Sequence, residues 1–254
     1  MTVIINKKAQ GAHEMNIVHL GVKVQEKVSN HINKEFYLSA EPEGMPNWEP
    51  EHYQAQIPKA SLNYDLNMRY FKSLDKNEFT EYIAKQCKKH KFIECKDLNT
   101  LSYVEGIYMM VLDDYNQVYI GQSTDIKKRI QGHWRKRQSL ERLIFGDICN
   151  SVLSIDAFGA LDTTRVFYIE TSNIYSLEEK IVRSFNPIYT LNRTAGGIGS
   201  TDTYTDSSAS ANMAIFASRR KKDFIPFVTI EELSSAVSEK DLKYYLRKYP
   251  NLVK

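Results

Sequence analysis

Two short apolar segments around residues 106–121 constrain the fold of this chain more than any other feature. The first opens with Gly-Ile-Tyr at 106–108, and the second ends with Tyr-Ile-Gly at 119–121. Between them lies the polar stretch Asp-Asp-Tyr-Asn at 113–116. Strand-forming residues joined by an Asp/Asn-rich turn indicate a β-hairpin. Both tyrosines are therefore expected on one small sheet.

A helix is expected directly after the hairpin, over residues 126–138. Residues 122–125 include three types that favour helix N-termini. At about 100° per residue, the apolar side chains of this helix share one face: Ile126, Ile130 and Trp134. Arg129 and His133 fall at the edge of that face, one turn apart. Spacing alone does not decide whether these two side chains are fixed beside the hairpin or extend into solvent.

A further strand is expected over residues 164–169, whose β-branched and aromatic residues suit pairing with the hairpin. Ser176 then favours the start of a helix over residues 177–185, which stops before Pro187.

Within that helix, Glu178 falls on the apolar face, whereas Glu179 points toward solvent. A carboxylate on a buried face needs a metal ion, a cation or several hydrogen-bond donors. Glu178 is therefore the acidic residue expected to be functional. An ion pair with Arg129 is the structural alternative.

Together these residues resemble the GIY-YIG nucleases over residues 106–192. Both name-giving tripeptides match letter for letter, and Arg129 and His133 follow in the next helix as in the family. Glu178 stands where the family places its metal-binding glutamate, ahead of a Pro-x-Tyr element at 187–189. The family's asparagine corresponds to Asn192, although Thr190 fills the closest equivalent position.

The resemblance implies hydrolysis of DNA phosphodiesters with one Mg²⁺ or Mn²⁺ ion held by Glu178. Tyr108 would accept the proton of the attacking water, directly or by relay. Its ordinary pKa of about 10 is too high for a base at neutral pH, so Arg129 would lower it while gripping the phosphate. Tyr119 would position water or phosphate, and His133 would assist proton transfer or bind phosphate.

Basic residues crowd the helix after the hairpin, and DNA is the partner that they favour. They are Lys127, Lys128, Arg135, Lys136 and Arg137. Such a patch supplies phosphate affinity without sequence specificity, and a solvated helix face is the alternative. The formal net charge of +3 permits a nucleic-acid partner without requiring one. Double-stranded DNA is the expected substrate, and a homodimer is compatible with cutting both strands.

The expected fold class is α/β of the α+β type, a small antiparallel sheet flanked by helices. Residues 1–100 form an accessory, mainly helical region, 101–195 the nuclease domain, 196–212 a linker, and 213–254 a short helical extension. Four prolines predict a loop over residues 41–58. A capping box at 75–78 predicts a helix that ends in the basic run 88–91, and a single helix is expected over 231–249.

Cysteine content and hydropathy indicate the cellular compartment in which the protein is expected. Three cysteines without CxxC spacing argue for a reducing environment, and Cys87, His90 and Cys95 lack a recognisable fourth zinc ligand. No apolar run approaches the roughly 18 residues of a membrane span. A soluble, cytoplasmic protein without a membrane partner is expected.

The sequence therefore predicts a metal-dependent DNA endonuclease, with restriction or phage defence as the favoured role. Homing, repair and RNA cleavage stay open, as does a non-catalytic nucleic-acid-binding or assembly protein that keeps the fold.

Overall fold

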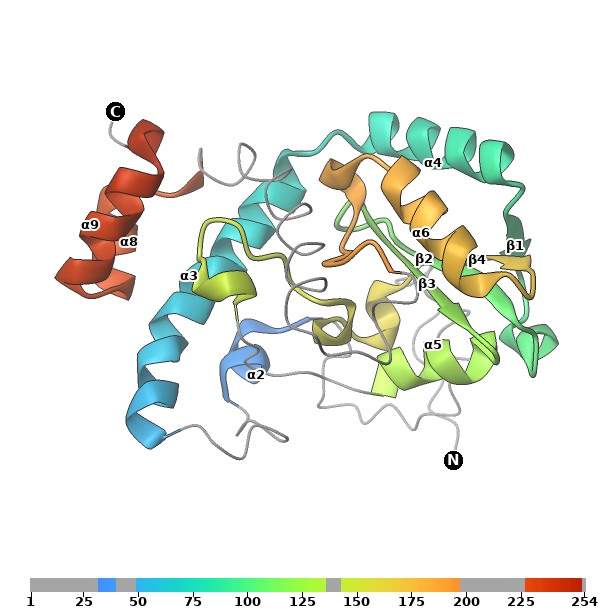
Figure 1. Cartoon of the computed structure of the whole chain (residues 1–254), viewed down its shortest axis with the longest axis horizontal. Helices are drawn as coiled ribbons and strands as arrows, with labels where there is room; N and C mark the ends of the chain where they lie inside the picture. Colours follow the sequence, from blue (N-terminus) through green and yellow to red (C-terminus); the bar gives the residue numbers. More distant parts are fainter. Residues whose placement is uncertain (1–31, 40–48, 136–142, 197–226, 253–254) are drawn as a thin grey trace, which may run out of the picture.

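The computed structural model describes residues 32–39, 49–135, 143–196 and 227–252. It is a mixed α/β structure around a four-stranded antiparallel sheet with the strand order β1-β4-β2-β3 (Figure 1). The strands are β1 (Ile93–Cys95), β2 (Gly106–Leu112), β3 (Gln117–Ser123) and β4 (Arg165–Glu170). The coarse α+β class expected from the sequence is confirmed.

The predicted hairpin is present as the antiparallel pair of β2 and β3. Tyr108 lies opposite Gly121, and Met110 lies opposite Tyr119. Asn116 adopts φ 52° in the turn, a left-handed conformation that asparagine tolerates better than most residues. The strand expected at 164–169 is β4, which pairs with β2 on its other side.

Every residue of β2 is buried because helices cover both faces of the sheet. Successive side chains of a strand point to opposite faces. Tyr108 and Met110 accordingly join a core with α5 (Ile126–Arg135) and α3 (Pro50–Ser73). Ile107 and Met109 join a second core with α4 (Lys76–His90) and α6 (Ile174–Ser184).

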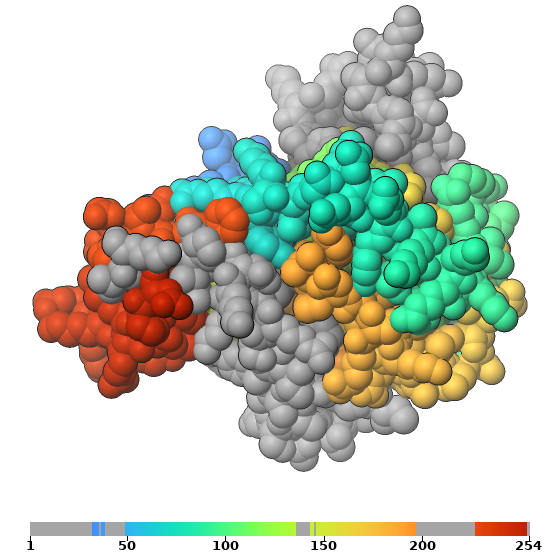
Figure 2. Space-filling model, turned by 90° about the horizontal axis from the view of Figure 1, so that it is seen from above, coloured from blue at the N-terminus to red at the C-terminus, as the bar shows by residue number. Residues whose placement is uncertain are grey.

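On the outside of the molecule, α4 and α6 lie side by side over one face of the sheet (Figure 2). The Tyr82 and Phe185 rings meet edge to face at 5.9 Å. The hydroxyl of Ser184 lies 2.9 Å from Nε2 of His90. The end of the predicted basic helix is thus fixed against the end of α6.

Asp75 caps α4 as predicted, through its own half of the expected capping box. The Asp75 carboxylate accepts hydrogen bonds from the backbone N–H groups of Asn77 and Glu78, both at 2.8 Å. The helix ends at Lys91, which adopts φ 59° and donates its N–H to the Cys87 carbonyl. These contacts involve residues at most four positions apart, which is why a local pattern could identify them.

The loop expected over residues 41–58 is wrong for its second half, because α3 begins at Pro50 and runs through Pro58. Proline is well suited to the first turn of a helix, where an N–H has no partner in any case. Pro58 and Gln54 are exposed, so the carbonyl that loses its helical partner can be hydrated. Residues 41–48 lie outside the described part of the chain.

Two helix predictions are also corrected. Helix α6 begins at Ile174 with Asn173 before it, so Ser176 lies inside the helix. The single helix expected over 231–249 is two helices, α8 (Ile230–Ala236) and α9 (Glu239–Lys248). Ser238 separates them because its side chain caps α9 by accepting from the Asp241 N–H.

The sheet and its core also draw on residues before position 101, the expected boundary of the nuclease domain. β1 pairs with β4 in register Glu94 to Phe167. Tyr37 of α2 (Lys34–Ser39) and Phe71 of α3 belong to the same buried cluster as Tyr108.

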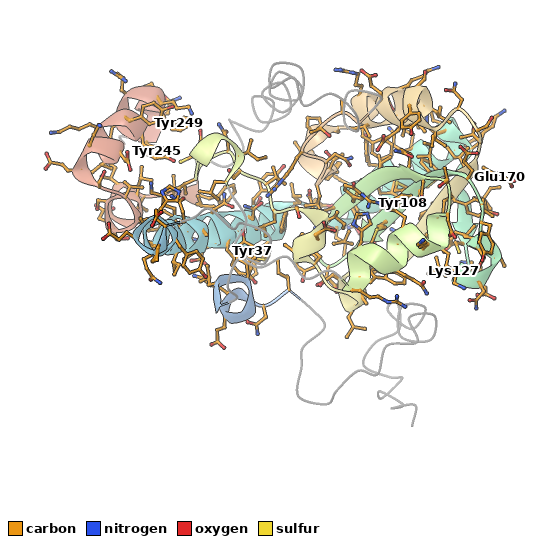
Figure 3. The ribbon with its side chains drawn as sticks, turned by 60° about the horizontal axis from the view of Figure 1, so that its bottom comes forward. Tyr37, Tyr108, Lys127, Glu170, Tyr245 and Tyr249 are labelled. Atoms are coloured by element: carbon orange, nitrogen blue, oxygen red, sulfur yellow. The ribbon has the colours of Figure 1, made fainter. Side chains whose placement is uncertain are left out.

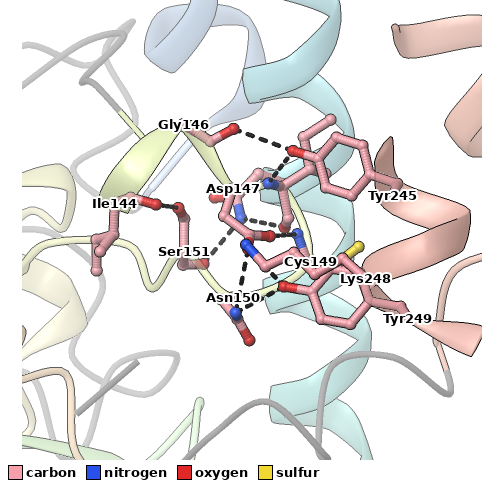
Figure 4. Close-up of polar contacts among 11 residues, drawn as sticks. Ile144, Gly146, Asp147, Cys149, Asn150, Ser151, Tyr245, Lys248 and Tyr249 are labelled. Carbon is pink, nitrogen blue, oxygen red and sulfur yellow. Dashed lines mark hydrogen bonds and ion pairs between the residues drawn. The ribbon is translucent and has the colours of Figure 1, made fainter. Parts of the chain in front are cut away.

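The C-terminal helices dock on α3 and on the segment that follows residue 142 (Figure 4). Asp147 is the centre of this contact. Its buried carboxylate accepts from the Tyr249 hydroxyl at 2.5 Å and from the Lys248 ammonium at 2.6 Å. The Tyr245 hydroxyl donates to the Gly146 carbonyl at 3.0 Å.

No helix in the described ranges has both the length and the apolar composition needed to cross a membrane. All three cysteines are free thiols.

Candidate active site

Tyr108 is completely buried, and its neighbours define where its phenol lies. Its oxygen is 2.8 Å from Nε2 of His133. A Cβ built on Gly121, directly opposite, would lie 2.4 Å from that oxygen. Glycine at 121 therefore provides the space that the Tyr108 ring occupies. Figure 3 places Tyr108 within the sheet region, away from Tyr245 and Tyr249 of the C-terminal extension.

Gly106 has a different reason to be glycine. A Cβ there would lie 2.1 Å from the carbonyl oxygen of Ile169 on β4. The two strands therefore approach each other as closely as they do only because position 106 lacks a side chain. The glycines of both tripeptides are explained by packing around Tyr108 and its strand.

His133 lies in α5 and is only 4% exposed. Its Nδ1 is 2.6 Å from a carboxylate oxygen of Asp156, and its Nε2 faces Tyr108. The His133 side chain is therefore fixed beside the hairpin and does not extend into solvent. Asp156 was not predicted, because it belongs to a segment without a recognisable motif.

Tyr119 is partly buried beside these groups. Its ring meets the His133 ring edge to face at 5.2 Å and lies 6.2 Å from the ring of Tyr108. Arg129, one turn before His133, is exposed at the surface and hydrogen-bonds to Tyr108. The hairpin tyrosines and the helix residues are therefore brought together.

The pKa of Tyr108 differs from the expectation that Arg129 would lower it. Burial raises the pKa of Tyr108 well above its ordinary value, and Tyr119 raises it further. The charge and hydrogen bond of Arg129 act in the expected, lowering direction without outweighing burial. Burial likewise raises the pKa of Tyr119 to about 12, against the opposing charge of Arg129. Both phenols are neutral at physiological pH in the protein alone.

Glu178 is 7% exposed on α6, whereas Glu179 forms a surface ion pair with Arg183 at 2.8 Å. The predicted distinction between the two carboxylates is confirmed. Gly196 lies against Glu178 with φ +73°, and a Cβ there would lie 2.5 Å from the carboxylate. The chain after the Pro-x-Tyr element thus leaves a space that fits this carboxylate.

Asn192 binds the backbone of β3 on both of its polar atoms. Its Oδ1 accepts from the Ile120 N–H at 3.0 Å, and its Nδ2 donates to the Ile120 carbonyl at 2.7 Å. This clamp fixes the strand next to Tyr119. Thr190, the other candidate for the asparagine position, is buried beside Val118 instead.

A pocket of about 260 Å³ opens among these elements. Five predicted residues line it, namely Tyr119, Arg129, His133, Glu178 and Asn192. Tyr108 lies behind this lining, in contact with His133. Residues that the sequence analysis missed also line the pocket: Ser154, Asp156, Arg193 and Thr194.

The missed residues come from two segments that follow no periodic pattern. Ser154 and Asp156 lie in the stretch between α5 and β4, for which the sequence analysis predicted no element. Arg193 donates to the Val152 carbonyl at 2.6 and 2.8 Å, which joins the two segments.

Three of the five basic residues predicted to bind DNA lie in the described helix α5. Lys128 and Arg135 are exposed, and Lys127 is partly exposed. Figure 3 shows Lys127 at the outer end of α5. Lys136 and Arg137 lie outside the described residues.

The carboxylate of Glu178 is a ligand of the type that hard divalent cations prefer. Mg²⁺ is commonly held by one or two carboxylates and keeps several waters. Glu178 supplies a carboxylate to a polar pocket, with the space at Gly196 behind it. Among the described residues, no group of three or more His, Cys, Asp and Glu side chains could hold a metal ion. Binding through Glu178 would therefore rely on water and substrate oxygens for the remaining ligands.

Comparison of the chain with protein family models, with curated proteins and with solved structures found no match.

Proposed function

We propose that the protein is a metal-dependent DNA endonuclease with a GIY-YIG-type active site. One observation carries the proposal. Residues from four separate elements converge on one small polar pocket, and they are the same residues that the sequence resemblance selects: Tyr108 (behind the lining), Tyr119, Arg129, His133 and Glu178.

Phosphate recognition is assigned first to Arg129. Its guanidinium is exposed at the pocket and is suited to bidentate contact with phosphate oxygens. Tyr108 is buried, so access of water to its phenol requires the contact with Arg129 to open, and phosphate is expected to compete for that contact. Lys127, Lys128 and Arg135 add a sequence-independent attraction along α5.

Water activation is assigned to Tyr108 together with His133. A neutral phenol is a poor base, and burial makes its ionisation harder still. The 2.8 Å contact with Nε2 of His133 offers a route by which Tyr108 can pass on its own proton as it accepts one. Asn192 holds the neighbouring strand β3 through the Ile120 backbone.

Glu178 is assigned as the protein ligand of Mg²⁺ or Mn²⁺. When bound, such a cation supplies Lewis-acid stabilisation of charge on the phosphate oxygens. Tyr119 and Arg129 face the same pocket and would orient the phosphate beside this position.

Cleavage of plasmid DNA in Mg²⁺ or Mn²⁺, compared with EDTA, tests the proposal. Glu178→Gln should lower the cleavage rate at least about 100-fold, as expected for loss of a metal ligand, and should leave DNA binding intact. Glu179→Gln is the matched control, because it removes the same charge from the adjacent, exposed position. Labelled RNA offered in parallel identifies the preferred nucleic acid.

The proposal is contradicted if neither DNA nor RNA is cut with any divalent metal, or if Glu178→Gln and Glu179→Gln cut at equal rates. Sequencing of the product ends would establish strand number and sequence preference together.

A further inference from the structure

Asp156 and His133 form a buried contact that neither the hairpin motif nor the helix pattern specifies. We propose that Asp156 is a positioning residue for the cleavage reaction, which holds His133 so that Nε2 faces Tyr108 as a proton acceptor. This inference rests on the proposed nuclease function and assigns a role to the segment between α5 and β4.

For a neutral His133 beside an ionised Asp156, the direction of each hydrogen bond in the chain follows. A neutral imidazole has one donor nitrogen and one acceptor nitrogen, and an ionised carboxylate only accepts. Nδ1 of His133, 2.6 Å from Asp156, therefore carries the proton. Nε2 is left to accept from the Tyr108 hydroxyl at 2.8 Å. A carboxylate that accepts from one ring nitrogen thus leaves the other nitrogen of a neutral imidazole as a hydrogen-bond acceptor.

Asp156 is itself held in place. It lies in the short 3-10 helix Ile155–Ala157, and the Ser154 hydroxyl caps this turn by accepting from the Asp156 N–H at 3.1 Å. Ile155 and Ala157 on either side are buried in the core shared with α5. The Asp156 carboxylate is therefore presented to His133 by a packed turn.

His133 is anchored from the same segment. The adjacent Trp134 donates its indole N–H to the Thr163 hydroxyl at 2.9 Å. Asp156 and Thr163 thus contact consecutive residues of α5. Residues 154–156 of this stretch form part of the wall of the pocket.

The hydrogen-bond chain from Tyr108 through His133 to Asp156 accounts for the proton that the attacking water loses. Water gives a proton to the Tyr108 oxygen while Tyr108 passes its own to Nε2 of His133, and the resulting imidazolium lies against the Asp156 carboxylate. The water oxygen bonds to phosphorus as the bond to the leaving alkoxide breaks with its electron pair. The alkoxide takes a proton from solvent, and His133 later returns one to solvent.

Asp156→Asn tests this role because asparagine keeps the shape but loses the charge and can present either a donor or an acceptor to Nδ1. We expect the single-turnover cleavage rate to fall about 100-fold, at the lower end of the effect of general acid–base groups, with DNA affinity unchanged within about twofold. Asp114→Asn is the control, since Asp114 is an exposed carboxylate in the hairpin turn.

Nitrogen-15 spectra of the histidine rings give a readout that does not depend on cleavage. The chain has six histidines, and the loss of one set of signals in His133→Gln assigns His133. The parent protein should show His133 protonated on Nδ1 and unprotonated on Nε2. Asp156→Asn should show a mixture of tautomers.

The outcomes separate the two proposals. A parent protein that cuts, with Asp156→Asn cutting at the same rate, overturns the role of Asp156 and leaves the nuclease function standing. His133 protonated on Nε2 in the parent also overturns it, even if the variant fails to fold. A parent protein that cuts no nucleic acid overturns the nuclease function, and the role of Asp156 in cleavage with it.

Discussion

Gly121 lies directly opposite Tyr108 across the β2–β3 pair, and a Cβ at Gly121 would overlap the phenolic oxygen at 2.4 Å. The last residue of one tripeptide thus makes room for the tyrosine of the other. The two motifs are one packing unit, with the Tyr108 hydroxyl held against His133 as the result.

Gly121→Ala should displace the Tyr108 ring. We expect a loss of about 1–3 kcal/mol in the free energy of unfolding, typical of overpacking, and a cleavage rate reduced at least tenfold. Gly132→Ala is the control, because a Cβ at this helical position meets no atom within 4 Å. It should stabilise α5 by roughly 0.5–1 kcal/mol. Urea unfolding and plasmid cleavage measure both effects, and a fully active, fully stable Gly121→Ala would contradict the packing argument.

Gly196→Ala should act on metal binding. Gly196 and Gly146 both adopt left-handed backbone, at φ +73° and +65°, so alanine introduces strain of about 1–2 kcal/mol at either. Only Gly196 adjoins Glu178, whereas a Cβ at Gly146 meets nothing within 4 Å. We expect about a tenfold higher Mg²⁺ concentration for half-maximal cleavage in Gly196→Ala alone. Equal metal dependence in the two variants would show that the space beside Glu178 is not required.

Tyr108→Phe should abolish cleavage, with a rate at least about 100-fold lower, while DNA binding survives. The ring still fills its place in the core, but Nε2 of His133 loses its partner, which costs about 1 kcal/mol of stability. Tyr103→Phe removes a hydroxyl from a residue that is 89% exposed and should change neither property. Single-turnover kinetics and DNA binding by fluorescence anisotropy provide the measurements. Cleavage by Tyr108→Phe at the parental rate would exclude the hydroxyl from the reaction.

Alkaline pH should destabilise the protein through its buried tyrosines. The pKa of Tyr119 is raised to about 12 in the folded protein, from about 10 in the unfolded chain. The unfolded state therefore releases its proton first, so stability is fully present below pH 10 and falls as the pH rises toward 12. Thermal unfolding midpoints from pH 8 to 12 should decline, and less steeply in Tyr119→Phe. Identical curves for parent and variant would contradict the shift assigned to Tyr119.

Asp147→Ala should release the C-terminal helices. The change removes the acceptor of Lys248, Tyr249 and the Cys149 N–H, all at a buried site, and we expect a loss of about 3–5 kcal/mol. Asp241→Ala breaks the half-exposed pair with Lys59 and should cost at most about 1 kcal/mol. Guanidinium unfolding followed by circular dichroism compares the two. Similar losses in both variants would mean that Asp147 is not the centre of this contact.

The sequence by itself determined the elements whose signals are local. The turn at 113–116, the Asp75 cap and the burial of Glu178 rather than Glu179 each depend on residues a few positions apart or on one helical face. Five of the eleven residues that line the pocket were expected from the sequence, and strand and helix periodicity contributed because they fix which side chains share a face.

The tertiary structure alone decided the partners that are distant in sequence. Asp156 reaches His133 from a segment with no periodic pattern, and Asn192 holds β3 from 72 positions away. The proline-containing α3 forms although local rules predict a loop, because its later turns are buried in the core. Burial also raises the pKa of Tyr108 where a neighbouring arginine alone suggested the opposite. Long-range contact and desolvation arise only once the whole chain has packed, so no short stretch of sequence contains them.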